Sequence, residues 1–175
     1  KDDLVPVDVE NGLIVNSRGA SSAETFVIGQ DAYIAIACFF DEASISFKTK
    51  SLLYRVTSST DSPSGVQTTL VQDFDTVAAH DVHHFVQGDM RYLAFALNSD
   101  EPSMLFAAPL QQNPPQFSLI QRLATRLATS FKVFTEGSTY MLVAQNGNQS
   151  LMLSWNGSQF VSDIDQFSPA NNLVG

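Results

Sequence analysis

The 175-residue chain is poor in cysteine, in basic residues and in long apolar runs. A disulfide framework needs at least two cysteines, and the chain has only Cys38. Because Cys38 lies in an apolar run, we expect a buried, inert thiol. No stretch approaches the roughly 18 apolar residues of a membrane helix, so membrane insertion is not expected. The polar start, Lys1-Asp2-Asp3, differs from a signal peptide, and without an initiating Met we expect a mature or excised piece.

Few positive charges oppose many negative ones. Nine Lys and Arg stand against eighteen Asp and Glu, which gives a formal charge of −9. Such a charge repels phosphate backbones and anionic lipids, so nucleic acid and membrane surfaces are not expected as partners. Basic partners or cations are favoured instead. With 44% hydrophobic residues, the chain has enough apolar material for a core.

Three segments of the chain share one template. Each has an Ala, a Phe six residues later, a Gly three further on, an aromatic-aliphatic pair, a second Ala, and a Ser before three bulky residues. Phe26, Phe85 and Phe134 mark the copies, which are 59 and 49 residues apart. Gln72 and Gln121 each precede the next of these Phe residues by 13 positions. The chain is therefore an internal repeat with a period near 50 residues.

Each copy has the pattern of four short strands, with apolar residues that alternate or cluster over four to seven positions. Turn residues support the division, since Gly follows the first predicted strand in every copy. A helix-like stretch at 119–129 has no helical counterpart in the other copies, and we discount it. The predicted strands are 25–28, 33–39, 52–56 and 68–71, then 83–86, 92–96, 104–107 and 117–120, then 131–134, 140–143, 151–155 and 160–164.

Four strands per 50-residue period are typical of a β-propeller blade. We therefore predict an all-β fold and a single segment, 1–175, with repeats at about 13–71, 72–120 and 121–166. A closed propeller needs at least four blades, so three copies and a strand-like segment at 4–9 cannot close alone. Either the chain is part of a longer propeller, which we favour, or several copies associate to complete a ring.

The third copy resembles a known family. It reads Phe117-Ser118-Leu119-Ile120-Gln121, then Ala128, Phe134, Gly137 and Tyr140-Met141, and finally Ser150 through Trp155-Asn156-Gly157-Ser158-Gln159-Phe160. This is similar to the EAR repeat, also called the epitempin or EPTP repeat. The first two copies share the skeleton but lack the Trp-Asn-Gly turn.

The resemblance implies a six- or seven-bladed extracellular propeller that serves protein recognition and cell adhesion without catalysis. The expected setting is secreted or cell-surface, and the expected partner is a protein. The alternative is a structural protein whose copies assemble into a ring or coat. A lectin-like or glycosidase-like propeller would use Trp155 as a stacking platform, but we expect that residue to serve in packing.

Three groups of polar residues are candidates for chemistry. His80 and His83 with a carboxylate would suit a metal, but successive strand residues point to opposite faces, so His83 and His84 cannot share one ion. Asp81 precedes a first strand, and the resemblance implies that an acidic residue there can hold calcium in the channel; no other cofactor is expected. The Asp73/Asp75 and Asp163/Asp165 pairs are interpreted as solvated faces.

The sequence favours no enzymatic activity. It has no Gly-x-Ser-x-Gly motif, no reactive-cysteine context and no Gly-Lys-Ser/Thr phosphate loop. It does have two N-glycosylation acceptors, Asn148 and Asn156, both in predicted hairpin turns. With the family resemblance they favour an extracellular glycoprotein.

Overall fold

The fold is built from β-strands in the computed structural model, which describes residues 17–62, 64–146 and 149–162. Within these residues there is no helix, and the strands form three four-stranded antiparallel sheets, each in chain order. The all-β prediction is confirmed. Sheet 1 holds β1 (Ala20–Ile28), β2 (Asp31–Cys38), β3 (Lys48–Ser58) and β4 (Val66–Val77); sheet 2 holds β5 (Ala79–Gln87), β6 (Met90–Leu97), β7 (Ser103–Pro109) and β8 (Ser118–Leu123); sheet 3 holds β9 (Ala128–Glu136), β10 (Ser138–Gln145), β11 (Leu151–Trp155) and β12 (Phe160–Ser162).

Each predicted strand overlaps an observed one, and most observed strands extend further. The stretch 119–129 is not helical, because β8 ends at Leu123 and β9 begins at Ala128. The strand-like segment 4–9 and the end of the last predicted strand lie outside the described residues. Residues 72 and 121, where the predicted repeats begin, lie inside β4 and β8.

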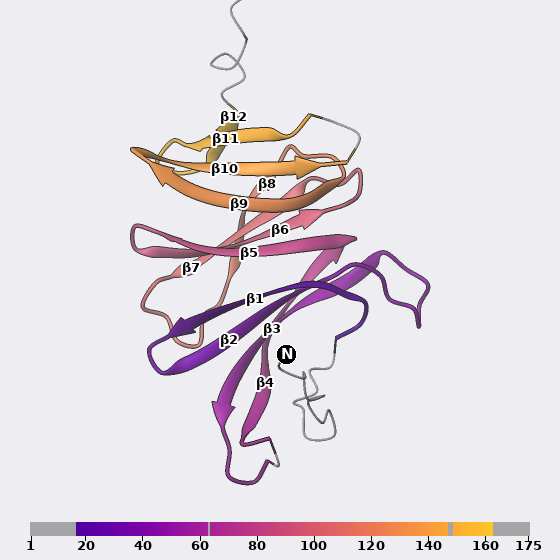
Figure 1. The fold of residues 1–175 in the computed structure, drawn as a ribbon, viewed down its shortest axis with the longest axis vertical. Coiled ribbons are helices and arrows are strands. Elements are labelled where there is room, and N and C mark those ends of the chain that lie inside the picture. The colour runs from indigo at the N-terminus through magenta and orange to yellow at the C-terminus, as the bar shows by residue number, and fades with distance from the viewer. Residues whose placement is uncertain (1–16, 63, 147–148, 163–175) are drawn as a thin grey trace, which may run out of the picture.

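The three sheets are stacked in chain order, and their first strands β1, β5 and β9 lie side by side (Figure 1). One apolar core lies between sheets 1 and 2 and a second between sheets 2 and 3. We call the face that a sheet turns toward the next sheet in the chain its forward face, and the opposite one its backward face. For sheet 3, the forward face is the one turned away from sheet 2.

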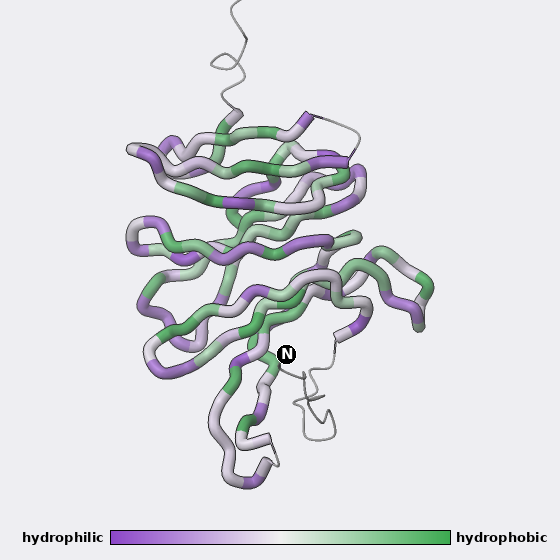
Figure 2. The backbone as a smooth tube through the Cα atoms, viewed as in Figure 1, coloured by the Kyte–Doolittle hydropathy of each residue, from purple (hydrophilic) through white to green (hydrophobic). Residues whose placement is uncertain are grey.

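The middle sheet is buried on both faces. Along β6, Leu93 and Phe95 pack toward sheet 1, whereas Tyr92 and Ala94 pack toward sheet 3. This is why the sequence of β6 is apolar without alternation. By contrast, Figure 2 shows hydrophilic residues along much of β5, which has no strand paired to its outer edge in the described sheet.

A glutamine side chain joins each sheet to the next. The amide of Gln72, on β4, donates to the Phe117 carbonyl at 2.7 Å and accepts from the Phe117 N–H at 2.8 Å. Gln121, on β8, does the same to Phe160, at 2.6 and 2.9 Å. Each glutamine thus pairs both backbone groups of one residue in the following sheet, so that neither is left unsatisfied. The two glutamines make the same contact, although they are 45 and 39 residues away from their partners in the sequence.

The first strand of every sheet is preceded by a residue with positive φ. The carbonyl of that residue accepts a hydrogen bond from the backbone N–H just beyond the second strand, which closes the sheet at this end. The three residues and their donors are Gly19 (φ 60°, from Phe39), Ala78 (φ 49°, from Asn98) and Leu127 (φ 51°, from Asn146).

Candidate functional site

The loop between β2 and β3 projects from the side of sheet 1. It comprises residues 39–47, and we call it the rim loop. Asp41 and Ser46 form an isolated bridge, with N···O distances of 2.8 and 3.2 Å between their backbones, so the tip is a tight hairpin. The corresponding β6–β7 connection runs only from residue 98 to 102. The rim loop is therefore an elaboration of sheet 1, of the kind that carries function on a rigid scaffold.

Asp41 holds the tip of the rim loop in shape. Its carboxylate accepts hydrogen bonds from the Ala43 N–H at 3.0 Å and from the Ser44 hydroxyl at 2.8 Å. Arg18 approaches the same carboxylate at 3.3 Å. The Ser44 hydroxyl is the main reason that the pKa of Asp41 lies below its usual value. The carboxylate is thus ionised, and its contacts are with the rim loop and Arg18.

Ile45 stands at this tip in a conformation that isoleucine rarely adopts. Its φ is 51°, in the left-handed region, and its side chain is 82% exposed. For a β-branched residue that backbone conformation costs about 1 to 2 kcal/mol. Local strain combined with an exposed apolar side chain is more often found at recognition sites than in scaffolds.

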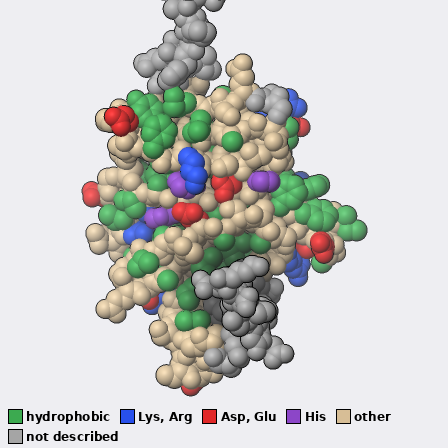
Figure 3. All heavy atoms as spheres, viewed as in Figure 1, with side chains coloured by type: hydrophobic (Ala, Val, Ile, Leu, Met, Phe, Trp, Pro, Cys, Tyr) green, Lys and Arg blue, Asp and Glu red, His purple; other side chains and the backbone are tan. Residues whose placement is uncertain are grey.

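Aromatic rings form the base of the rim loop. The Phe47 ring, half exposed, packs edge-on against Phe39 at 5.3 Å and tilted against Phe40 at 5.0 Å. Phe39 also meets the His80 ring of sheet 2 at 6.0 Å. Figure 3 shows apolar side chains gathered at the right edge of the molecule, where the rim loop projects in Figure 1. The rim loop therefore presents apolar side chains above a base of packed aromatic rings.

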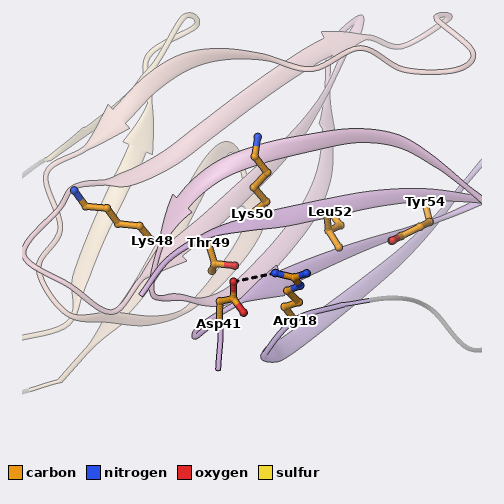
Figure 4. Close-up of a pocket in the computed structure, with 7 residues that line it drawn as sticks. All are labelled: Arg18, Asp41, Lys48, Thr49, Lys50, Leu52 and Tyr54. Atoms are coloured by element: carbon orange, nitrogen blue, oxygen red, sulfur yellow. Dashed lines mark hydrogen bonds and ion pairs between the residues drawn. The ribbon is translucent and has the colours of Figure 1, made fainter. Parts of the chain in front are cut away.

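A groove of about 340 Å³ lies beside the rim loop on sheet 1. Figure 4 shows Arg18 and Asp41 facing each other in it, while Lys48 and Lys50 on β3 point away from that pair. Lys50 bridges Asp73 at 2.9 Å and Asp75 at 3.2 Å, and this contact raises the pKa of Lys50. The predicted solvated pair Asp73/Asp75 is thus exposed and engaged with a lysine.

Asp81 lies among the first strands of all three sheets. One carboxylate oxygen accepts the Ser22 hydroxyl of β1 at 2.7 Å, and the other accepts the Phe131 N–H of β9 at 3.1 Å. Asp81, on β5, thus joins its neighbours on both sides. Among the described residues there is no group of three or more His, Cys, Asp or Glu that could hold a metal. Calcium at Asp81 remains a prediction.

The histidines of β5 do not converge. His84 stacks on Phe26 of sheet 1, with ring centroids 4.1 Å apart, and burial lowers its pKa to about 4. The pKa of His83 is also lowered, again chiefly by burial. Glu24 on β1 raises this pKa slightly, and Lys132 on β9 lowers it slightly. Figure 3 shows charged and histidine side chains across the middle of this face. The argument that His83 and His84 point to opposite sides is consistent with these contacts.

The remaining sequence candidates have these environments. Asn156 is exposed, and its side-chain oxygen accepts the backbone N–H and the hydroxyl of Ser158, both at 3.1 Å. Asn148 and Asp163/Asp165 lie outside the described residues. Trp155 packs edge-on against Tyr92 and Phe160, as predicted for a packing residue. Cys38 is fully buried, and burial raises its pKa, as expected for an inert thiol.

Sequence reasoning missed the rim loop as a site. Its only sequence signals were the extra residues between Phe39 and Ser51 and the apolar Ile45 and Phe47 among polar neighbours. No protein-family model matches the chain, and no curated protein sequence is detectably similar to it. The resemblance to the EAR repeat therefore rests on the quoted residues alone.

Proposed function

We propose that this chain is a non-catalytic, extracellular protein-recognition module of the EAR type, whose sheets are propeller blades and whose rim loop contacts the partner. The observation that carries the proposal is Ile45, which is 82% exposed in a strained backbone on an anchored loop. The partner is a protein with an apolar pocket. Basic residues around that pocket would complement the formal charge of −9.

The blade assignment has two supports. The three sheets have the same four-stranded order and are stacked with their first strands adjacent, as blades are around a channel. The glutamine contact that joins sheet 1 to sheet 2 is repeated between sheets 2 and 3. Equivalent contacts at equivalent positions are expected when each repeat is one structural unit that packs on its neighbours.

The test is Ile45→Gly, because this change separates recognition from folding. Glycine tolerates positive φ, so the variant should be more stable than the wild type by about 1 kcal/mol in urea unfolding. It also removes the apolar side chain, so binding of the labelled chain to intact cell surfaces should fall at least tenfold. A structural residue would not give a gain in stability together with a loss of binding.

The matched control is Val86→Thr, which alters another exposed apolar residue, on β5 of sheet 2 rather than on the rim loop. Val86→Thr should bind as the wild type does, and prior protease treatment of the cells should abolish binding of both. Wild-type binding by Ile45→Gly would refute the role of the rim loop. Turnover of a small molecule by a chain that binds no cell-surface protein would refute the recognition function.

A second candidate function, assembly of several copies into a ring, is favoured by a different observation. Phe134 and Leu142 on the forward face of sheet 3 are 45% and 44% exposed, although their equivalents in the other sheets are largely buried. The rim loop and this face of sheet 3 have no residue in common.

A further inference from the structure

The forward face of sheet 3 is the third example of a surface that is covered in the other two sheets. In sheet 1 it carries Phe26, which is 7% exposed, and Tyr33, which is fully buried. In sheet 2 the corresponding tyrosine, Tyr92, is 5% exposed. On sheet 3 the corresponding pair is Phe134 and Tyr140, and there the phenylalanine is 45% exposed.

The Phe–Tyr pair has the same geometry whether or not it is covered. The two rings are stacked in all three sheets, with centroid separations of 5.4, 4.8 and 5.5 Å in sheets 1, 2 and 3. The interplanar angles are 13°, 9° and 25° in the same order. Sheet 3 therefore presents this surface already in the arrangement that the other two sheets use for packing.

In sheets 1 and 2, the surface that packs on the forward face is the backward face of the next four-stranded sheet. Phe26 meets Phe117, the residue before β8 of sheet 2, edge-on at 6.5 Å, and Phe85 meets Phe160 of sheet 3 edge-on at 5.9 Å. Within the described part of the chain, sheet 1 alone has a backward face that is not packed on another sheet. This face carries the partly exposed residues Ile34, Leu52 and Val56.

We propose that the forward face of sheet 3 binds the backward face of sheet 1 of a second copy of this chain. Because the two faces belong to opposite ends of the stack, the contact is head-to-tail, and such contacts close into rings when the rotation permits. Two copies of three sheets supply six, which is within the usual four to eight blades of a propeller. This rests on the proposed blade architecture but not on the rim loop.

The test is the mass of the whole chain in sedimentation equilibrium from 1 to 200 µM. The monomer is 19.1 kDa, and the expected species is twice that mass. Leu142→Glu places a charge on the proposed contact face of sheet 3 and should weaken self-association at least 30-fold. The matched control is Val86→Glu, since Val86 is 47% exposed, on β5 of sheet 2, and that variant should associate as the wild type does.

Mixing variants tests the head-to-tail arrangement. Leu52→Glu, on the backward face of sheet 1, should also be monomeric, but mixing it with Leu142→Glu should restore a two-chain complex, because one unaltered interface remains. Far-UV circular dichroism establishes that each variant is folded. A monomeric wild type at every concentration, a dimer insensitive to either charge, or no complex on mixing would each overturn the proposal. Loss of self-association with rim-loop binding intact would leave the recognition function standing.

Discussion

Stability should fall as the pH is lowered from 7 to 5, and His84 should cause much of the loss. Its folded-state pKa is about 4 against an ordinary value of 6.5, because it is buried against Phe26 and lies near Arg91. Between these two values the unfolded chain binds a proton that the folded chain does not. The free energy of unfolding therefore falls as the pH falls through this window, and the contribution is complete only above pH 6.5.

The size of the effect follows from the two pKa values. Across pH 7 to 5, which stays above the isoelectric point near 4.5, they correspond to a loss of about 2 kcal/mol. Partial exposure of the ring lowers this to roughly 1 to 2 kcal/mol. Asp31 and Asp41 do not contribute in this range, because hydrogen bonds from Arg55 and Ser44, respectively, lower their pKa values from 3.8.

The assay is urea unfolding at pH 7, 6 and 5, followed by the fluorescence of Trp155 and by circular dichroism. His84→Phe keeps a ring against Phe26 and removes the proton site, so its free energy of unfolding should depend less steeply on pH. Some slope will remain, because the pKa of His83 is lowered as well. Val86→Thr, an exposed change on the same strand, should keep the wild-type slope. If His84→Phe retains the full wild-type slope, the reasoning is refuted.

Further predictions concern the sheet contacts, the positive-φ positions and the glycan. Gln121→Met leaves two backbone groups of Phe160 without partners, so urea unfolding should show a loss of about 2 kcal/mol. Gly19→Ala should strongly lower the free energy of unfolding, since a Cβ would collide with the Phe40 carbonyl. Ala78→Gly relieves the positive φ, so it should change the free energy of unfolding little or raise it by up to about 1 kcal/mol. Asn156 should carry a glycan after secretion from a eukaryotic host, and Asn156→Gln should lose the corresponding mass; an unchanged mass would contradict this.

The positions of the strands could be predicted because apolar residues mark the strands and glycines mark the turns between them. Alternating apolar residues marked β1 and β10, and Gly29, Gly88 and Gly137 marked the first hairpins, where all three have positive φ. Ala78 and Leu127 could not be recognised as left-handed positions, because only Gly19 among the three equivalents is a glycine. There the hydrogen bond closing the sheet overrides local preference.

Side-chain roles were harder to predict than strands, because they depend on neighbours distant in sequence. Gln72 and Gln121 were visible as a repeated spacing, but their pairing with Phe117 and Phe160 needs the packing of adjacent sheets. The strain at Ile45 likewise follows from the Asp41–Ser46 bridge, which no local pattern encodes. The sequence predicted the strands of the three sheets, but not which surfaces of those sheets stay exposed.

The role of Asp81 can be decided by separating hydrogen bonding from ion binding. Its two oxygens accept from Ser22 and from Phe131, so it can link three sheets without a cation. Asp81→Asn keeps the size but places an amide N–H opposite one of those donors, and we expect a loss of about 1 to 3 kcal/mol in calcium-free buffer. Urea unfolding with and without millimolar calcium measures it. If the variant loses stability only when calcium is present, the cation, not the hydrogen bonds, accounts for Asp81.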